Sequence, residues 1–273
     1  MIEIVDPGPY ASVQDIGRAG LARLGVARSG AFDRAALRLA NRLVGNRSAA
    51  AAIEVTLGGL VLRVHDAVTV ALAGAVCPGL DWGSPVSLAA RATVHLHAPA
   101  RGLRSYLAVR GGLAVQSELG SRSTDTMSGL GPPRLRRGDR LAIGAEIAAG
   151  VDGATASPRA ALRQLRVIAG PRDDWFAADA LARLCASTWT VRPESNRVGI
   201  RLDGPRLERI RTDELPSEPT LPGALQVPPD GRPILFGPDA PVTGGYPVIA
   251  VVHDGDLDAA AQWRPGYPIR FSQ

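Results

Sequence analysis

The chain has 273 residues, of which 45% are hydrophobic and 21% charged, a composition typical of a soluble globular protein with one large or two smaller domains. A net charge of +5 is compatible with nucleic-acid binding, but the arginines are dispersed and aromatic residues make up only 4%, which argues against such a surface. No run approaches the roughly 18 to 20 apolar residues of a membrane helix, and the first ten residues lack the features of a signal peptide, so we expect a cytoplasmic protein without membrane contact.

The most discriminating feature of the composition is the absence of lysine, because all 31 lysine-or-arginine positions are arginine. A biotinyl carrier attaches its cofactor to a lysine, a Walker A loop places one on the nucleotide phosphates, and a Ser-Ser-Lys amidase uses one as its base. The sequence therefore predicts no covalent biotin on this chain and excludes these activities for the chain alone.

Glycine (31 residues) and proline (22 residues) interrupt short runs of alternating apolar and polar residues. This pattern predicts a mainly β protein, a barrel or a sandwich, with few short helices. In the first half the predicted strands are Ile2–Val5, Ile53–Leu57, Leu60–Val64, Ala67–Leu72, Thr93–His97, Arg104–Val109 and Arg140–Ile143. In the second half they are Gln164–Ile168, Trp189–Arg192, Val198–Leu202, Ala224–Val227, Pro233–Phe236, Val248–Val252 and Pro268–Phe271.

Three segments have helical patterns instead. Asp33–Leu43 ends before a Gly-Asn stop, Asp174–Cys185 follows an aspartate cap, and Asp256–Trp263 precedes a proline. Residues 150–163 lose the alternation and gain Gly, Ala, Ser and Pro, as expected where few contacts cross a domain boundary. We therefore predict an N-terminal domain over 1–152 and a C-terminal domain over 163–273.

A glycine-rich run near the N-terminus carries several polar residues of interest: Gln14, Asp15, Arg18, Ser29 and Asp33. Glycines in such a loop permit sharp turns and the close approach of a ligand or another chain. The alternative is structural, with Asp33 as a helix cap and Asp15 paired with Arg18. Both interpretations stay open from the residues alone.

Metal, redox and dinucleotide chemistry find little support in the sequence. His95 and His97 share one face of a predicted strand about 7 Å apart, but no third ligand lies nearby. Cys77 and Cys185 lie in apolar surroundings without a CxxC pair, so we predict buried thiols. The stretch SGLGPPR at 128–134 has prolines where the helix of a dinucleotide-binding loop should begin. We predict no metal site.

Polar residues of the second half gather at a strand start and in two constrained loops. Asn196 and Arg197 precede a predicted strand that carries Arg201, so two guanidiniums and an amide could converge on a phosphate, carboxylate or ureido oxygen. The loops at 223–233 and 238–252 are tightened by proline and glycine, which fixes polar groups in the way that stabilising an oxyanion requires. Their polar residues are Gln226, Asp239, Thr243 and Tyr246.

An ordered set of motifs covers nearly the whole chain: QDIGRAG, SGAFDRAALRLANRLVGN, YLAVRGGL, GSRSTD, SNRVGIRLDGP, GALQVPPDGRPI, VTGGYPVIAVV and AAQWRPGYPIRF. With these motifs the sequence resembles the biotin-dependent carboxyltransferase family, also called the allophanate hydrolase subunit 2 family. The resemblance implies two cyclophilin-like β-barrel domains in tandem. Members of the family occur in urea amidolyase, in 5-oxoprolinase, and beside an inhibitor of a sporulation kinase.

A free-standing member without a carrier lysine or a fused amidase implies one subunit of a hydrolase complex that opens 5-oxo-L-proline to L-glutamate with ATP hydrolysis. The expected partners are the family B subunit, which is allophanate hydrolase subunit 1-like, and a lactam-utilisation A subunit. ATP is the expected cofactor, bound by this chain or by a partner. Two alternatives remain: biotin-dependent carboxyl transfer to urea or a related amide, and a non-catalytic regulator paired with a kinase-inhibitor protein.

The resemblance also implies residue roles. Arg197 and Arg201 would orient a carboxylate or phosphate, while side-chain donors would stabilise the amide oxygen as negative charge gathers there. A structural salt bridge is the alternative for Arg197. The predicted catalytic residues are Arg197, Gln226, Thr243 and Tyr246, and the predicted substrate-binding residues are Asn196, Arg201, Arg122, Asp239, Gln14 and Arg18.

Overall fold

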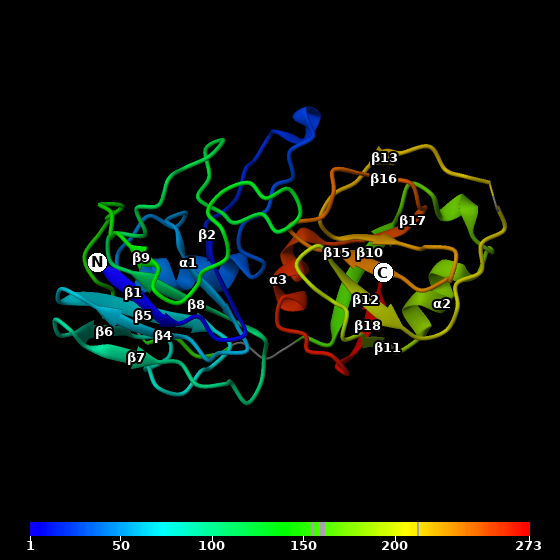
Figure 1. The fold of residues 1–273 in the computed structure, drawn as a ribbon. Helices are drawn as coiled ribbons and strands as arrows, with labels where there is room; N and C mark the ends of the chain where they lie inside the picture. The colour runs from blue at the N-terminus through cyan, green and yellow to red at the C-terminus, as the bar shows by residue number, and fades with distance from the viewer. Residues whose placement is uncertain (154, 159–161, 212) are drawn as a thin grey trace. The chain divides into compact units, whose positions relative to one another are not determined.

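A computed structural model describes residues 1–153, 155–158, 162–211 and 213–273 (Figure 1). The chain divides into two compact units that do not strictly follow sequence order. The first unit comprises Met1–Arg18, Ser29–Asp125 and Gly129–Ala160, and the second comprises Ala19–Arg28, Thr126–Ser128 and Ala161–Gln273. The boundary predicted within 150–163 includes residues 154 and 159–161, which lie outside the described residues. The division into domains 1–152 and 163–273 stays a prediction.

The first unit has three layers, namely two antiparallel sheets and a helix. The five-stranded sheet has the order β2 (Tyr10–Gln14), β3 (Ala52–Thr56), β8 (Arg104–Val109), β5 (Val68–Gly74) and β6 (Pro85–Leu88). The four-stranded sheet has the order β7 (Thr93–His95), β4 (Val61–Val64), β1 (Ile2–Asp6) and β9 (Arg140–Leu141). The helix α1 (Arg34–Leu43) covers the outer face of the five-stranded sheet (Figure 1).

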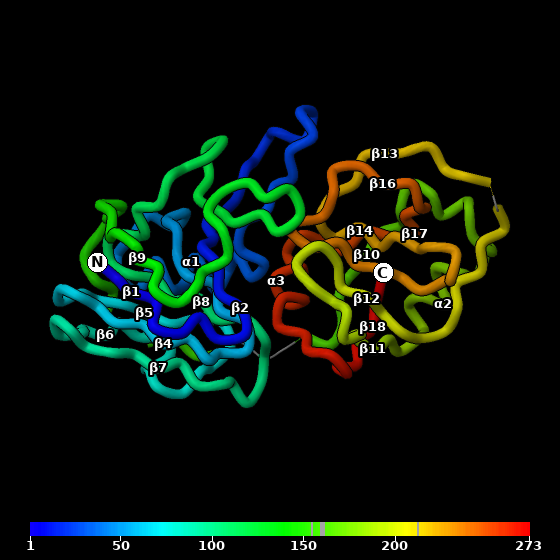
Figure 2. The backbone as a smooth tube through the Cα atoms, viewed as in Figure 1, coloured from blue at the N-terminus to red at the C-terminus, as the bar shows by residue number. Residues whose placement is uncertain are grey.

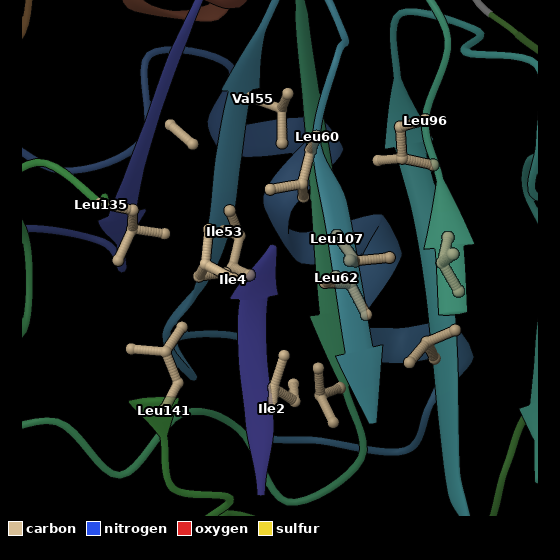
Figure 3. Packing of buried hydrophobic residues seen from close by; sticks show 14 of the residues in the cluster. Ile2, Ile4, Ile53, Val55, Leu60, Leu62, Leu96, Leu107, Leu135 and Leu141 are labelled. Carbon is tan, nitrogen blue, oxygen red and sulfur yellow. The ribbon is translucent and has the colours of Figure 1, made fainter. Parts of the chain in front are cut away.

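The main core of this unit lies between the two sheets (Figure 3). Ile53 of β3 lies opposite Leu107 of β8 in the strand register, so both side chains project from the same face of the sheet. They meet Ile2 and Ile4 of β1, and all four are fully buried. Burial of each such side chain contributes roughly 1.5 to 3 kcal/mol to folding, so this interface contributes substantially to the stability of the unit.

The alternate residues of the same strands face α1. Tyr106 and Ala108 flank Leu107 on β8 and pack with Leu37 and other apolar residues of the helix. Small residues predominate beneath the helix, which lets it approach the sheet closely; they are Ala52, Ala71, Ala73 and Ala108. Because both of its faces are covered, β8 is buried at every position, unlike a strand with one face in water.

The second unit is built around a closed seven-stranded barrel (Figures 1 and 2). Its order is β10 (Gln164–Ala169), β17 (Val248–Val252), β14 (Ala224–Gln226), β15 (Ile234–Phe236), β12 (Gly199–Asp203), β11 (Trp189–Val191) and β18 (Pro268–Ser272). Parallel pairing of β10 with β18 closes the ring, so each barrel strand is paired on both sides. A separate antiparallel pair joins β13 (Glu218–Pro219) to β16 (Thr243–Gly244).

The remaining helices are short: η1 (Ala22–Leu24), η2 (Asp173–Trp175), α2 (Ala180–Ala186), η3 (Asp254–Asp256) and α3 (Leu257–Ala260). The mainly β architecture with few short helices is confirmed, as is a barrel in the second unit, whereas the first unit has two separate sheets in place of the other predicted barrel. None of the helices in the described part of the chain combines the length and apolar character that crossing a bilayer requires.

Two predicted helices needed correction, and four strands were missed. The predicted helix Asp174–Cys185 is interrupted because Phe176 is extended and buried, forming a bridge with Arg209. The predicted helix Asp256–Trp263 contains α helix only at Leu257–Ala260. Strands β2, β6, β13 and β16 were missed: β2 has only two apolar residues in the core, Ala11 and Val13, β6 has mixed burial, and β13 and β16 span two residues each.

The start of α1 provides a test of local structure. Asp33 Oδ1 accepts a hydrogen bond from the backbone N–H of Ala36 at 2.8 Å, which satisfies a donor that the helix itself cannot pair. We expect Asp33→Ala to lower the free energy of unfolding by about 1 kcal/mol, measured by urea denaturation. Asp33→Asn keeps a cap acceptor and should lose clearly less; equal losses for the two variants would contradict the capping role.

Candidate functional site

Asp15, which follows β2, organises the loop 120–125 in the first unit. Its Oδ1 accepts hydrogen bonds from the Gly17 backbone N–H at 2.7 Å and from the Ser121 and Ser123 hydroxyls at 2.6 Å each. Its Oδ2 accepts one from the Arg122 backbone N–H at 2.6 Å. These four donors offset the desolvation of a buried carboxylate. Asp15 therefore fixes the loop through uncharged donors.

Gln14 and Arg18, on either side of Asp15, hold the same loop through its backbone. Gln14 Nε2 donates to the Ser12 hydroxyl and to the Thr124 carbonyl, both at 3.0 Å. Arg18 Nη2 donates to the Ser123 carbonyl at 2.8 Å, and Arg18 Nε donates to the Glu118 carbonyl at 3.2 Å. Gln14 is 0% exposed and Arg18 is 2% exposed. Both predicted substrate-binding side chains are thus interior groups of the first unit.

Arg122 is tied into the same region but remains half-buried. Its Nε donates to the Val115 carbonyl at 2.9 Å, and its Nη1 forms an ion pair with Glu146 Oε1 at 2.9 Å. The structure therefore brings Gln14, Arg18 and Arg122 to one loop, where Arg122 already has an internal counter-ion. Its predicted role in substrate binding stays a prediction.

A buried network beneath the start of α1 was not found by sequence reasoning. Tyr106 donates its hydroxyl hydrogen to Glu54 Oε2 at 2.7 Å and accepts from the Asp33 backbone N–H at 2.7 Å. The carboxylate of Glu54 lies 3.6 Å from Arg104 Nε, and the Arg104 guanidinium carbon lies 4.6 Å from the centre of the Phe32 ring. Burial, followed by the charge of Glu54, raises the pKa of Tyr106 well above its ordinary value. The phenol therefore stays protonated and acts as a fixed donor.

In the second unit, Arg197 forms a buried, two-pronged ion pair with Asp239. Arg197 Nε and Nη2 lie 2.9 and 2.8 Å from the two oxygens of the Asp239 carboxylate. Asp239 Oδ2 also accepts from the backbone N–H and hydroxyl of Thr126, at 3.1 and 2.7 Å. Arg197 is 4% exposed and Asp239 is 0% exposed. This is the salt-bridge arrangement considered for Arg197, and it joins segments that are distant in sequence.

Asn196 and Arg201 do not extend this ion pair into an anion clamp. Asn196 Oδ1 accepts from the backbone N–H groups of Val198 and Gly199, at 2.8 and 3.2 Å, which is a local turn. Arg201 lies on the exposed side of β12, between buried Ile200 and Leu202. Arg197 thus faces Asp239 and Arg201 is exposed, and the convergence of the two on one anion stays a prediction.

The segment that begins at β16 carries Thr243 and Tyr246, and it is contacted by Gln226 of β14. Gln226 Nε2 donates to the Tyr246 carbonyl at 2.8 Å, so this buried amide holds the loop in place. A side chain at Gly244 would put its Cβ 2.5 Å from Gln226 Nε2, which explains the glycine. Thr243 is exposed on β16, and Tyr246 is 45% exposed. Three predicted catalytic residues are thus adjacent, two of them with side chains accessible to a ligand.

The histidines do not add a metal site to these clusters. His95 and His97 are both exposed, with ring centres 6.2 Å apart. Across residues 1–153, 155–158, 162–211 and 213–273, no group of three or more His, Cys, Asp or Glu side chains is arranged to hold a metal ion.

The four hydrogen bonds to Asp15 make a specific prediction. Asp15→Asn replaces one acceptor oxygen with an NH2 group that would face a donor, so we expect a loss of roughly 1 to 3 kcal/mol in the free energy of unfolding, measured by urea denaturation. The matched control is Asp6→Asn, since Asp6 is exposed and accepts a local bond from the Gly8 backbone N–H. An equally small effect at both positions would contradict the organising role of Asp15.

Arg197 and Arg201 form a natural pair for a second test. Arg197→Lys keeps the charge but cannot fill both prongs of the buried pair, so we expect it to lower unfolding free energy by roughly 2 kcal/mol. Arg201→Lys, on the exposed face of β12, should change it by at most about 0.5 kcal/mol. Denaturation monitored by circular dichroism measures both. A fully stable Arg197→Lys protein would refute the structural importance of the fork.

Comparison with known proteins covers essentially the whole chain. It is 39% identical to the C subunit of 5-oxoprolinase from Escherichia coli (strain K12), covering 100% of this chain and 91% of the relative. It is 35% identical to the corresponding C subunit from Haemophilus influenzae, with 99% and 90% coverage. The structure of K. lactis urea amidolyase matches with a TM-score of 0.92 at 29% identity, over 99% of this chain but only 18% of that larger chain.

The family match agrees with this similarity and extends over both units. The model of the carboxyltransferase domain, subdomain A and B, matches residues 24–273, which include the Arg197–Asp239 pair and the Gln226 loop. The chain therefore belongs to the carboxyltransferase domain family.

Proposed function

We propose that the chain is one subunit of a complex that opens 5-oxo-L-proline to L-glutamate with ATP hydrolysis. The observation that carries the proposal is the end-to-end correspondence with two proteins that are each named as the C subunit of 5-oxoprolinase, of which this chain spans 91% and 90%. In contrast, it spans 18% of K. lactis urea amidolyase, most of which lies outside the matched part. The correspondence with the two C subunits is therefore the more complete one.

The chemistry of this reaction requires activation of an unstrained lactam. Transfer of the terminal phosphoryl group of ATP to the amide oxygen makes that oxygen a leaving group. Water then adds to the carbon, and the C–N bond breaks as the ring nitrogen takes up a proton, which leaves an acyl phosphate. A second water hydrolyses this acyl phosphate to the free carboxylate of L-glutamate and phosphate. A protein can accelerate these steps by orienting the lactam and by donating hydrogen bonds to the oxygen where negative charge develops.

The loop of Gln226, Thr243 and Tyr246 suits the donor role in the second unit. The exposed hydroxyls of Thr243 and Tyr246 are available to a ligand, while Gln226 fixes the loop backbone through the Tyr246 carbonyl. Arg201 is exposed and suits direct contact with a carboxylate or phosphate, whereas the Arg197 fork faces Asp239 and suits positioning. The roles of Asn196, Arg122, Gln14 and Arg18 in substrate binding belong to the same proposal.

Assembly with partners is part of the function we propose. Lysine is absent from the sequence, so nucleotide binding through a Walker A lysine would require another chain. We infer a hetero-oligomer with the B subunit and the lactam-utilisation A subunit, with ATP bound by one of the three chains. The second candidate is carboxyl transfer to urea or a related amide, favoured by the similarity to urea amidolyase; biotin would then be carried by a partner.

Coexpression of the three chains tests the proposed activity. We expect the complex to release phosphate and L-glutamate only when both ATP and 5-oxo-L-proline are present, and we expect the isolated chain to be inactive. The complex without this chain is the control. Ring opening by the isolated chain would contradict the requirement for partners. A three-chain complex that does not open 5-oxo-L-proline, but supports biotin-dependent carboxyl transfer, would favour the second candidate.

Within an active complex, Tyr246→Phe tests the donor loop. Removing a donor to the developing negative charge should lower kcat by roughly ten- to a hundredfold. Tyr267→Phe is the control: Tyr267 is half-buried beside Arg163, whose guanidinium carbon lies 5.5 Å from the ring centre. Equal activity of the two variants, with assembly intact, would remove the Tyr246 hydroxyl from the site.

A further inference from the structure

The loop held by Asp15, and the two side chains that flank Asp15 and hold the same loop, contain buried polar atoms that the protein itself leaves unpaired. Among the described residues, Gln14 Oε1, Arg18 Nη1 and Thr124 Oγ1 are shielded from solvent and have no hydrogen-bond partner. Leaving a buried donor or acceptor unpaired is unfavourable, so such groups call for an explanation. Two of these side chains hydrogen-bond to the backbone of the loop that carries the third, which indicates a partner that the chain does not provide.

These side chains are anchored on adjacent peptide groups. Gln14 Nε2 donates to the Thr124 carbonyl, and Arg18 Nη2 donates to the preceding carbonyl, that of Ser123. The unpaired atoms belong to the same planar groups as these donors, except for the hydroxyl of Thr124 itself. The turn that contains Gly131 packs against this region, because a Cβ at Gly131 would lie 2.7 Å from Arg18 Nη2. The groups are therefore held rigidly under a glycine turn.

The polarity of the unpaired atoms restricts the missing partner. Because a carbonyl can only accept, the Gln14 group that faces the Thr124 carbonyl must be its NH2, which leaves Oε1 as an acceptor. Arg18 Nη1 can only donate, and the Thr124 hydroxyl can do either. A simple anion offers no donor to Gln14, and a simple cation offers no acceptor to Arg18. The partner must present a donor beside an acceptor.

A lactam meets this requirement, since its ring forces the N–H and the C=O onto the same edge. We propose that Gln14, Arg18 and Thr124 form a binding site for such an amide edge, with the N–H donated to Gln14 Oε1 and the carbonyl oxygen accepting from Arg18 Nη1 and Thr124 Oγ1. This inference rests on the proposed function for the identity of the substrate. It adds Thr124 to the site and places the neutral amide, rather than an anion, against Arg18.

Binding to the isolated full-length chain tests the site without turnover. The probes are 2-pyrrolidinone, which has the lactam edge but no carboxylate, and N-methyl-2-pyrrolidinone, which lacks the N–H. Titration of 15N-labelled protein by NMR should show saturable shifts with 2-pyrrolidinone and at least about tenfold weaker binding of the N-methyl compound, the loss expected for one hydrogen bond. Absence of binding, or equal binding of both probes, would overturn the proposal and leave buried water as the partner.

Thr124→Val supplies a variant that should fold, because it removes only a hydroxyl that has no partner among the described residues and keeps the shape of the side chain. We expect its melting temperature to be no lower than that of the parent, while its Kd for 2-pyrrolidinone rises about fivefold to tenfold. Thr69→Val, at a half-buried position of β5 in the same unit, is the matched control and should leave Kd unchanged. An unchanged Kd in Thr124→Val would also overturn the proposal.

The two hypotheses fail in different experiments. Lactam binding that depends on Thr124, combined with a three-chain complex lacking 5-oxo-L-proline-dependent ATP hydrolysis, would keep the site and reject the proposed function. An active complex whose KM and kcat are unaffected by Thr124→Val, combined with an isolated chain that binds neither probe, would reject the site and keep the function.

Discussion

The loops of both units depend on carboxylates that have been taken out of water. A buried carboxylate is tolerated only when several donors replace its hydration, and those donors must then stay in place. Asp15 collects two backbone N–H groups and two serine hydroxyls in the first unit. Asp239 collects the Arg197 fork and both donors of Thr126 in the second. Each carboxylate thereby converts a glycine-rich or proline-rich loop into a fixed surface.

The two carboxylates use different donors, and the difference bears on function. Asp15 is held by uncharged donors, so its carboxylate does not pair with the neighbouring guanidinium of Arg18. That guanidinium donates instead to the uncharged carbonyls of Ser123 and Glu118. The negative charge of Asp239 is neutralised by the positive charge of Arg197, so the pair as a whole carries no net charge. Every long basic side chain of this protein is an arginine. The partners that each guanidinium group can reach therefore decide whether that arginine stabilises the fold or binds a ligand.

The sequence predicted the parts of the fold that follow from regular alternation. Val248–Val252 and Arg104–Val109 were placed with their observed ends, and the cap at Asp33 was one of the two interpretations considered for that residue, because capping is a local interaction. Strand β2 escaped prediction because Gln14 is buried through a hydrogen bond to the Thr124 carbonyl, so its polarity gives the wrong indication of exposure. The local sequence pattern contains no information about a hydrogen-bond partner that lies more than a hundred residues away.

The candidate site shows the same limit more sharply. Motifs indicated Arg197 and Asp239 as separate ligands for substrate, whereas their mutual pairing across 42 positions became visible only in three dimensions. Glu54 and Tyr106 looked like ordinary strand residues, although they form a buried polar network. Thr124 was likewise passed over within the GSRSTD motif. The hydroxyls of Ser121 and Ser123 donate to Asp15, whereas the Thr124 hydroxyl has no partner among the described residues. This contrast within one loop distinguishes the two serines, which stabilise the loop, from Thr124, which we propose to bind a ligand.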